Sequence, residues 1–259
     1  MIKRILVLLC LGYISLNAKS LEITLAYENE SNPPYALGHG KSIDLIKPGI
    51  TIDLLKKIGK KLNIKISFTR VPWKRGLLML KTNNIDGLFH ASFKEKRAKF
   101  SVYPLTNEIV DVNKAIMTNA YYLYTNKNSN LSWDGDKFIN LNGKVGITKG
   151  FSIIDNVKNK NKIELCNSLS SGLNKLNFKT VEGIINLENR VDSMILNNPI
   201  KYKDIKKIKT PIKTKPYYLI FSKEFYSKNK DTVEKIWSQI NIMKKNGEYN
   251  EIKAKYFNH

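Results

Sequence analysis

The chain has 259 residues, and its 44 Lys and Arg against 22 Asp and Glu give a formal net charge of +22. This length suffices for one large domain or for two moderate lobes, each with its own core. The basic residues are scattered along the chain with no basic arm or tail, which argues against nucleic acid as the partner. We interpret the charge as a solvated surface that also attracts anionic ligands.

The N-terminus has the order of a secretory signal peptide: basic residues, an apolar run over residues 5–16, and small residues before Leu21. We therefore expect residues 1–20 to be a signal peptide and the mature protein to be periplasmic and soluble. Cys10 does not fit a lipid-attachment site, because Leu9 precedes it where a small residue is required. The apolar run is too short to span a bilayer as a mature helix.

Strand and helix patterns alternate in the first part of the mature chain. Leu21–Tyr27 and Ile85–Ser92 have the composition of strands, and Ile64–Thr69 alternates apolar and polar residues like a half-buried strand. Thr51–Leu62 carries apolar residues on one helical face and lysines on the other, and Trp73–Lys81 continues from a proline suited to a first helical turn. This βαβαβ order predicts a mostly parallel sheet covered by helices.

A loop-rich stretch over residues 104–113 separates this set from a second one. Further strands are expected at Tyr121–Tyr124, Lys144–Thr148, Lys162–Cys166, Val181–Asn186 and Tyr217–Phe221, and helices from about Ser152, at Ser170–Leu176, Glu188–Leu196 and Asp231–Lys245. Cys166 is the only cysteine after the signal peptide, which excludes an intramolecular disulfide. We expect it to be a buried thiol.

Five motifs follow one another in a defined order. They are NPPYA at 32–36, PGITIDLLKKIGKKLNIKISF at 48–68, VPWKRGLLMLKTNNIDGLFHASFKEKRAKFSVYP at 71–104, GKVGITKGFS at 143–152, and EKIWSQINIMKKNGEYNEIKAKYF at 234–257. In this order they resemble the extracytoplasmic solute-binding proteins of family 3, the polar-amino-acid type. The resemblance covers nearly all of the mature chain.

The resemblance implies an α/β, two-lobed fold of the periplasmic-binding-protein type II, with a ligand cleft between the lobes. Two hinge crossings are expected near Asn119–Tyr122 and Lys215–Tyr218. Lobe 1 would then comprise residues 21–118 and 217–259, and lobe 2 would be an insertion over residues 119–216. Ligands of such folds sit at the carboxyl ends of strands, and the lobes close around them by a hinge motion.

Arg97 is the first candidate for ligand binding. A guanidinium presents a rigid fork of donors that fits a carboxylate. The resemblance places Arg97 where the family grips the ligand's carboxylate, with the Ser92 hydroxyl assisting. The alternatives are one more surface cation for Arg97 and a cap at the end of a strand for Ser92.

Further candidates come from two loops and one helix start. Gly150, Phe151 and Ser152 follow a strand, where backbone N–H groups can meet an anion; a tight turn capped by Ser152 is the alternative, and both can hold together. Tyr35 and Trp73 are candidate aromatic walls of the pocket. For Trp73, a place in the core is an equally good interpretation.

The family pairs the ligand's ammonium with an aspartate, and two segments compete for that position. Residues 179–188 supply a strand followed by a helix and place Leu187 at the acid position with Glu188 beside it. Residues 189–197 would place Asn197 there. Neither offers an aspartate, so we take Glu188 as the candidate, with a helix-starting acid as the alternative. A carboxylate-bearing ligand is thus better supported than an α-amino acid.

No sequence pattern indicates catalysis, and no cofactor or metal is expected. His90, a lone histidine among apolar residues, is assigned no catalytic role. The resemblance implies a monomeric solute receptor that delivers a small polar ligand to an ABC permease. The alternatives are a ligand-sensing subunit for a membrane kinase or chemoreceptor, and an enzyme on the same scaffold, such as a dehydratase.

Overall fold

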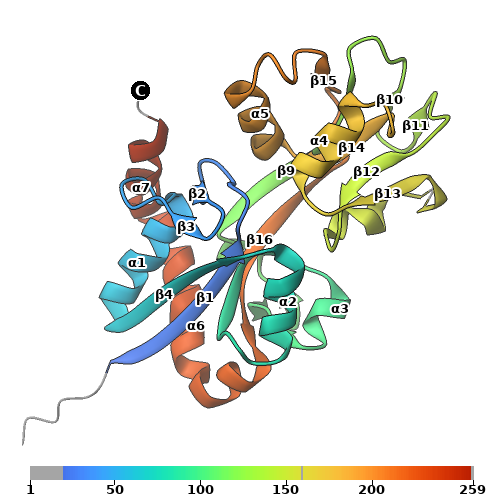
Figure 1. Cartoon of the computed structure of the whole chain (residues 1–259). Coiled ribbons are helices and arrows are strands. Elements are labelled where there is room, and N and C mark those ends of the chain that lie inside the picture. Colours follow the sequence, from blue (N-terminus) through green and yellow to red (C-terminus); the bar gives the residue numbers. More distant parts are fainter. Residues whose placement is uncertain (1–19, 159, 258–259) are drawn as a thin grey trace, which may run out of the picture.

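The computed structural model describes residues 20–158 and 160–257. The expected signal peptide lies outside the described residues, except for Ser20. A mixed sheet of ten strands runs through the molecule, in the order β13-β12-β14-β9-β16-β5-β1-β4, with β15 added to β9 and β6 added to β16. Two groups of helices cover its two ends, and the result is a two-lobed α/β fold (Figure 1).

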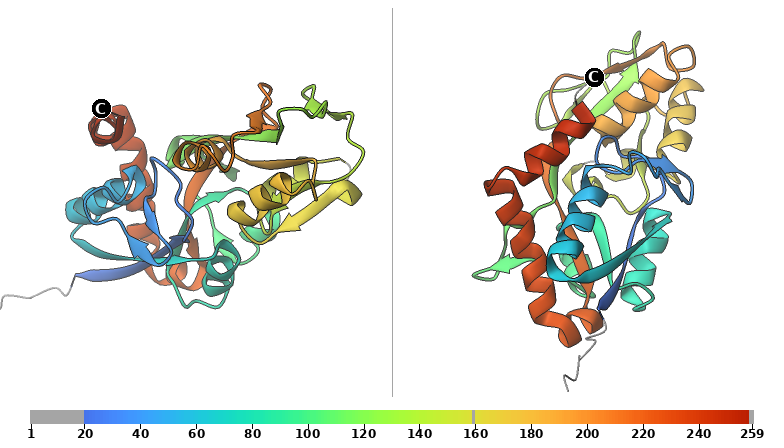
Figure 2. Two further views of the ribbon diagram at one scale, coloured as in Figure 1. Left: turned by 45° about the horizontal axis from the view of Figure 1, so that its top comes forward. Right: turned by 90° about the vertical axis from the view of Figure 1, so that its left-hand side faces the viewer.

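The first lobe is built on β1, β4 and β5. Its elements are β1 (Leu21–Glu28), β2 (Gly38–His39), β3 (Ser42–Ile43), α1 (Ile50–Leu62), β4 (Ile64–Val71), α2 (Trp73–Lys81), β5 (Gly87–Ser92), α3 (Glu95–Ala98), β6 (Ser101–Val102), β7 (Leu105–Thr106), β8 (Ile109–Val110), the 3₁₀ turn η1 (Val112–Lys114), α6 (Lys223–Lys245) and α7 (Glu248–Phe257). Figure 2 shows α6 and α7 on the same side of this lobe as α1.

The second lobe is built on β12, β13 and β14. Its elements are β10 (Ser132–Trp133), β11 (Phe138–Ile139), β12 (Val145–Thr148), the 3₁₀ turns η2 (Ser152–Asn156) and η3 (Lys160–Lys162), β13 (Ile163–Cys166), α4 (Leu169–Asn177), β14 (Gly183–Leu187), α5 (Glu188–Asn197) and β15 (Ile205–Lys207). Cys166 is a free, buried cysteine, as the sequence predicts.

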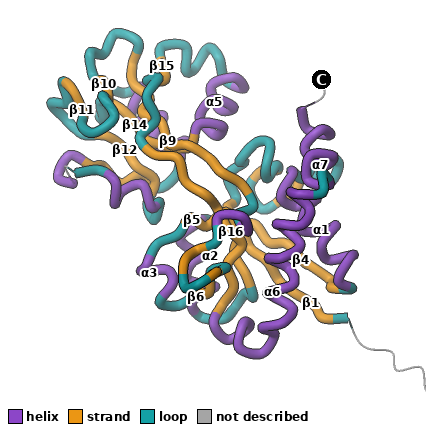
Figure 3. Tube along the Cα trace, turned by 180° about the vertical axis from the view of Figure 1, so that it is seen from behind, coloured by secondary structure: helices purple, strands orange, loops and turns teal. Residues whose placement is uncertain are grey.

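Two long strands join the lobes. β9 (Met117–Asn126) and β16 (Lys213–Ser222) pair antiparallel, with Lys213 opposite Tyr121 and Tyr217 opposite Met117. Figure 3 shows them side by side between the lobes. The two segments expected as hinge crossings therefore lie in paired strands, and the two-lobed fold class is confirmed. The residue at which each lobe begins stays a prediction.

The sequence pattern explains the helices that pack on the sheet. In α1, Leu54, Leu55 and Ile58 are fully buried, and the helix ends at Asn63, whose left-handed conformation bonds back to the last turn. In α6, the buried Trp237 donates its indole N–H to the carbonyl of Leu219 at 2.8 Å. Both helices thus bury one apolar face and leave lysines in solvent.

One expectation about local structure is wrong. The segment from Ser152 is not an α-helix but the short 3₁₀ turn η2, which Val157 ends in an extended conformation. Asp155 and Asn156 occur there, and such side chains compete with the helical backbone for hydrogen bonds. The parallel sheet expected from the βαβαβ order of residues 21–92 is confirmed, because β1 pairs parallel with β4 and β5. The whole sheet is mixed, because β9 and β16 run antiparallel to their neighbours.

Candidate functional site

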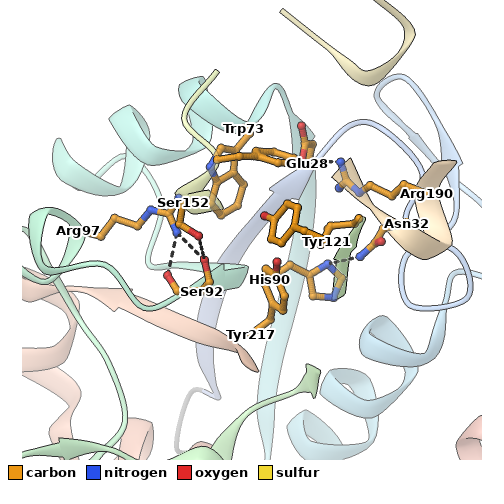
Figure 4. A pocket seen from close by; sticks show the side chains of 12 residues that line it. Glu28, Asn32, Trp73, His90, Ser92, Arg97, Tyr121, Ser152, Arg190 and Tyr217 are labelled. Atoms are coloured by element: carbon orange, nitrogen blue, oxygen red, sulfur yellow. Dashed lines mark hydrogen bonds and ion pairs between the residues drawn. The ribbon is translucent and has the colours of Figure 1, made fainter. Parts of the chain in front are cut away.

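A small cavity lies between the lobes, where strands of both lobes end. Its volume is about 20 Å³, which is room for about one water molecule. It is lined by Glu28, Asn32, Trp73, His90, Ser92, Arg97, Tyr121, Phe151, Ser152, Leu187, Arg190 and Tyr217. Figure 4 shows most of these side chains gathered around it. The lobes are therefore closed on each other at this point.

Arg97 is held at the cavity by the short helix α3, which follows the end of β5. The residue is only 4% exposed. Its Nη1 donates to the Ser92 carbonyl at 2.8 Å and approaches the Ser92 Oγ at 3.3 Å, and its Nη2 donates to the Gly150 carbonyl at 2.8 Å. None of the ion pairs found within residues 20–158 and 160–257 includes Arg97. A buried guanidinium that has only neutral acceptors is well suited to receive an anion.

Two serines connect the lobes next to Arg97. The hydroxyls of Ser92 on β5 and Ser152 on η2 lie 2.6 Å apart. The Nζ of Lys215, on the crossing strand β16, donates to the carbonyl and the hydroxyl of Ser152, each at 3.2 Å. Burial lowers the pKa of Lys215 to about 8, with the nearby charge of Arg97 contributing in the same direction. This end of the cavity thus has positive charge and hydroxyl groups.

The loop after β12 was expected to offer backbone N–H groups to an anion, and one of its residues does not fit this expectation. The Phe151 N–H donates to the Thr148 carbonyl at 3.1 Å, so it closes a turn and does not meet an anion. Gly150 has a φ of 83°, and a Cβ atom there would lie 3.3 Å from the Trp73 ring. Glycine therefore permits both the turn and the close approach to Trp73. The Gly150 carbonyl, rather than its N–H, is the group that meets Arg97.

The aromatic candidates occupy different places. Trp73 lines the cavity, and the Arg97 guanidinium lies 5.2 Å from the centre of its ring. Phe151 also lines the cavity and packs edge-on against Tyr121. Tyr35 is not among the lining residues; its ring packs edge-on against His90 at 6.4 Å. It supports the cavity wall from behind.

Glu188 does not face the cavity in this structure. Its side chain is 39% exposed, and its Oε1 accepts a bond from the Lys207 Nζ at 2.8 Å. Leu187, the residue before it, lines the cavity and is buried. The position that we aligned with the family's ammonium-binding acid therefore carries an apolar side chain.

Sequence reasoning missed a buried ion pair on the far side of the cavity from Arg97. Arg190, in the first turn of α5, is 4% exposed, and its Nη1 lies 2.9 Å from the Oε2 of Glu28 at the end of β1. A second carboxylate, Glu30, lies 3.8 Å from the same nitrogen and accepts the Leu169 N–H at the start of α4. Burial raises the pKa of Glu28, and Arg190 opposes that shift. In the sequence, one member is the charged residue at the end of a buried strand and the other is in the first helical turn after another buried strand.

His90 belongs to a polar chain that crosses the cleft. Its Nε2 lies 2.8 Å from the Thr51 hydroxyl, and its Nδ1 lies 3.4 Å from the Asn32 amide nitrogen. Because the Asn32 amide donates, we infer that Nδ1 accepts and that Nε2 carries the proton. Asn189 of α5 donates to the Asn32 Oδ1 at 3.0 Å, which extends the chain into the second lobe. Burial, with the charge of Arg190, lowers the pKa of His90 to about 3.

Within the described part of the chain, no group of three or more His, Cys, Asp or Glu side chains could hold a metal ion. No helix among the described residues is long and apolar enough to cross a membrane.

Comparison with known proteins identifies the family to which the chain belongs. The model of bacterial extracellular solute-binding proteins, family 3, matches residues 23–259. No curated protein matches the sequence. Among solved structures, a histidine kinase sensor domain similar to periplasmic binding proteins has a TM-score of 0.74 at 15% identity, covering 92% of this chain and 97% of that one.

Two transport proteins have comparable folds. The substrate-binding protein of an amino acid ABC transporter has a TM-score of 0.71 at 17% identity, covering 92% of this chain and 100% of that one. A periplasmic binding protein of an arginine transport system from Legionella pneumophila has a TM-score of 0.70 at 19% identity, with coverages of 92% and 100%. At these identities the likeness establishes the fold.

Proposed function

The chain belongs to the bacterial extracellular solute-binding proteins, family 3, and on this premise we propose that it captures a small carboxylate-bearing solute between its lobes and delivers it to an ABC importer. Its family and its structural neighbours are binding proteins and receptors. Amino acids and related acids are the solute class that the transport neighbours suggest.

One observation carries this proposal: Arg97 is buried at the cavity with carbonyl and hydroxyl partners only. Desolvation makes an unpaired guanidinium costly, and a carboxylate that enters beside it recovers that cost through two parallel, charge-assisted hydrogen bonds. The Ser92 and Ser152 hydroxyls, 2.6 Å apart, lie next to Arg97 and can donate to the same anion.

A thermal-shift screen followed by calorimetry tests the proposal. The panel consists of amino acids and small carboxylic acids, each with its amide or ester as the uncharged partner. A true ligand at 100 times its dissociation constant stabilises the protein by about 2.7 kcal/mol. We expect stabilisation by at least one carboxylate and none by its uncharged partner. Equal stabilisation by the two members of each pair contradicts the carboxylate site.

The second candidate function is sensing, and the fold of a histidine kinase sensor domain favours it. In that case the same cleft binds a ligand, and closure is transmitted to a membrane kinase or chemoreceptor. Uptake of the labelled ligand by cells, with and without this protein, separates the two functions. Loss of uptake in its absence supports transport, whereas unchanged uptake with loss of a ligand response supports sensing.

Location outside the cytoplasm is also part of the proposal. N-terminal sequencing of the protein recovered from the periplasmic fraction is expected to give Leu21 or a residue close to it. Recovery with Met1 intact contradicts export, and lipid on Cys10 contradicts a soluble mature form that begins near Leu21.

A further inference from the structure

Three large apolar side chains stand in solvent at one end of the second lobe. Phe178 directly follows α4, Leu196 is in the last turn of α5, and Ile200 is in the loop between α5 and β15. They are 79%, 79% and 87% exposed. The amide nitrogen of Asn177 donates to the Lys201 carbonyl at 3.0 Å, so the end of α4 and the loop after α5 are in contact. Figure 1 shows this loop at the top of the second lobe, on the side away from the first lobe.

Five lysines lie in three segments that meet at this end of the lobe. The segments are residues 126–129, 176–182 and 196–206, and the lysines are Lys127, Lys179, Lys201, Lys203 and Lys206. The Lys206 Nζ donates to the carbonyls of Lys127 and Ser129, both at 2.9 Å, and the Lys127 N–H donates to the Asp204 carbonyl at 2.7 Å. Lys179 and Ser129 line the same surface depression. We call these three segments the distal tip.

The distal tip has an excess of positive charge. Besides the five lysines it contains two acidic residues, Glu182 and Asp204, which leaves a net charge of +3. The Glu182 carboxylate accepts hydrogen bonds from the backbone N–H groups of Asn142 and Gly143. None of the ion pairs found within residues 20–158 and 160–257 includes one of these five lysines. Their charges therefore remain available to an anionic partner.

From this arrangement we propose that the distal tip docks on the surface of an anionic lipid bilayer. The exposed apolar side chains enter the headgroup region, and the lysines meet the lipid phosphates. A protein partner fits this composition less well, because lysine is depleted in protein–protein interfaces while arginine is enriched, and the distal tip contains five lysines and no arginine. Single exposed apolar residues are common on protein surfaces, whereas three of them beside a basic cluster mark an interaction site.

Docking at the distal tip leaves the cleft free. Both helices begin next to Glu30 of the first lobe, which accepts the Leu169 N–H at the start of α4 and lies 3.8 Å from Arg190 in the first turn of α5. They end at the distal tip, and helices of nine and ten residues are about 15 Å long. The inference goes beyond the proposed function: docking concentrates the solute-loaded protein at the membrane that holds its importer or kinase.

Co-sedimentation of the mature protein with lipid vesicles tests the inference. Vesicles of phosphatidylglycerol and phosphatidylcholine are compared with vesicles of phosphatidylcholine alone, at about 0.15 M salt, where the Debye length is about 8 Å. We expect binding to the anionic vesicles only, and weaker binding as the salt concentration is raised. K201Q/K203Q should lower the partition coefficient at least about tenfold, because each lysine near an anionic surface contributes about fivefold. K56Q/K60Q, the same change at exposed lysines on α1, should retain most of the binding.

The apolar contribution is measured separately. F178S/I200S should lower the partition coefficient at least about tenfold, because two large apolar side chains no longer enter the headgroup region. L105S/I109S, at exposed apolar residues of β7 and β8 in the first lobe, is the control and should bind like wild type. The indole fluorescence of F178W should shift to shorter wavelength on the anionic vesicles, whereas that of I109W should not shift.

Equal binding to the two kinds of vesicle, or no binding to either, overturns the inference. The same loss of binding in K201Q/K203Q and in K56Q/K60Q also overturns it, because it shows attraction by overall charge alone. Sedimentation velocity detects the other occupant: a dimer that F178S/I200S converts to a monomer means that a second copy of the chain, and not a bilayer, covers the distal tip.

Discussion

The Nη2 atom of Arg97 donates to the carbonyl oxygen of Gly150 at 2.8 Å, so a side chain of the first lobe is bonded to the backbone of the second. The Ser92–Ser152 contact at 2.6 Å and the Arg190–Glu28 pair at 2.9 Å bridge the same cleft. These contacts close a cavity of about 20 Å³. An amino acid cannot fit in this volume, so binding requires the lobes to separate and Arg97 to exchange the Gly150 carbonyl for the ligand.

The first prediction concerns Arg97. Arg97→Ala should remove most of the affinity for a carboxylate ligand, because truncating one partner of a buried charge pair costs roughly 2–5 kcal/mol. Arg97→Lys should restore binding only in part, since an ammonium lacks the planar fork. Lys60→Ala, at an exposed position on α1, is the control and should bind like wild type. Calorimetry measures all three, and wild-type affinity in folded Arg97→Ala rules out the carboxylate clamp.

The second prediction concerns the hinge. β9 and β16 are the two paired strands between the lobes, so rotation about them opens and closes the cleft. Small-angle scattering should therefore give different radii of gyration for the protein with and without a ligand proven by calorimetry. A ligand that binds without changing the scattering curve argues that the lobes do not move.

The order of the elements was predictable because it depends on local pattern, and the resemblance to the family pointed to Arg97 through the motif at residues 71–104. The spacing between the end of β5 and α3 brings Arg97 back to Ser92, its own strand end. The Arg190–Glu28 pair was not predictable, because its members lie far apart in the chain and meet only when the lobes close. Glu188 was the candidate because it stands beside the position where the family has an acid, while the structure pairs its side chain with Lys207.

The third prediction concerns acid stability. His90 has a pKa of about 3 in the folded protein against 6.5 for the ordinary side chain. Between these values the unfolded chain binds a proton that the folded chain does not, so the free energy of unfolding falls as pH falls through this window. His90→Asn removes this contribution, which has a slope of at most about 1.4 kcal/mol per pH unit. Asparagine also tolerates the positive φ of 63° at this position.

Urea denaturation between pH 7 and pH 4 measures this effect. The loss of stability on acidification should be smaller in His90→Asn than in wild type. His39→Asn, the same change at an exposed histidine, is the control and should follow wild type. Identical pH profiles for wild type and His90→Asn would show that His90 takes up its proton equally in both states.

The last prediction concerns binding in alkaline solution. The pKa of Lys215 is about 8, lowered first by burial and then by Arg97, Lys213 and Lys94, while Asp155 opposes the shift. Its ammonium contacts Ser152, beside the anion site, so a bound carboxylate raises this pKa, and binding takes up a proton above pH 8. Affinity should therefore be constant below pH 8 and fall severalfold, by at most about tenfold per pH unit, above it.

In Lys215→Gln the affinity should be weaker at pH 7 and should not show this fall. Lys213→Gln, at an exposed position on the same strand, should retain it. Calorimetry from pH 7 to pH 9 on wild type and the two variants measures this fall in affinity. The ligand's own titration affects all three proteins equally, so a difference between them reports on Lys215. Parallel pH profiles for wild type and Lys215→Gln would mean that Lys215 is not coupled to the anion.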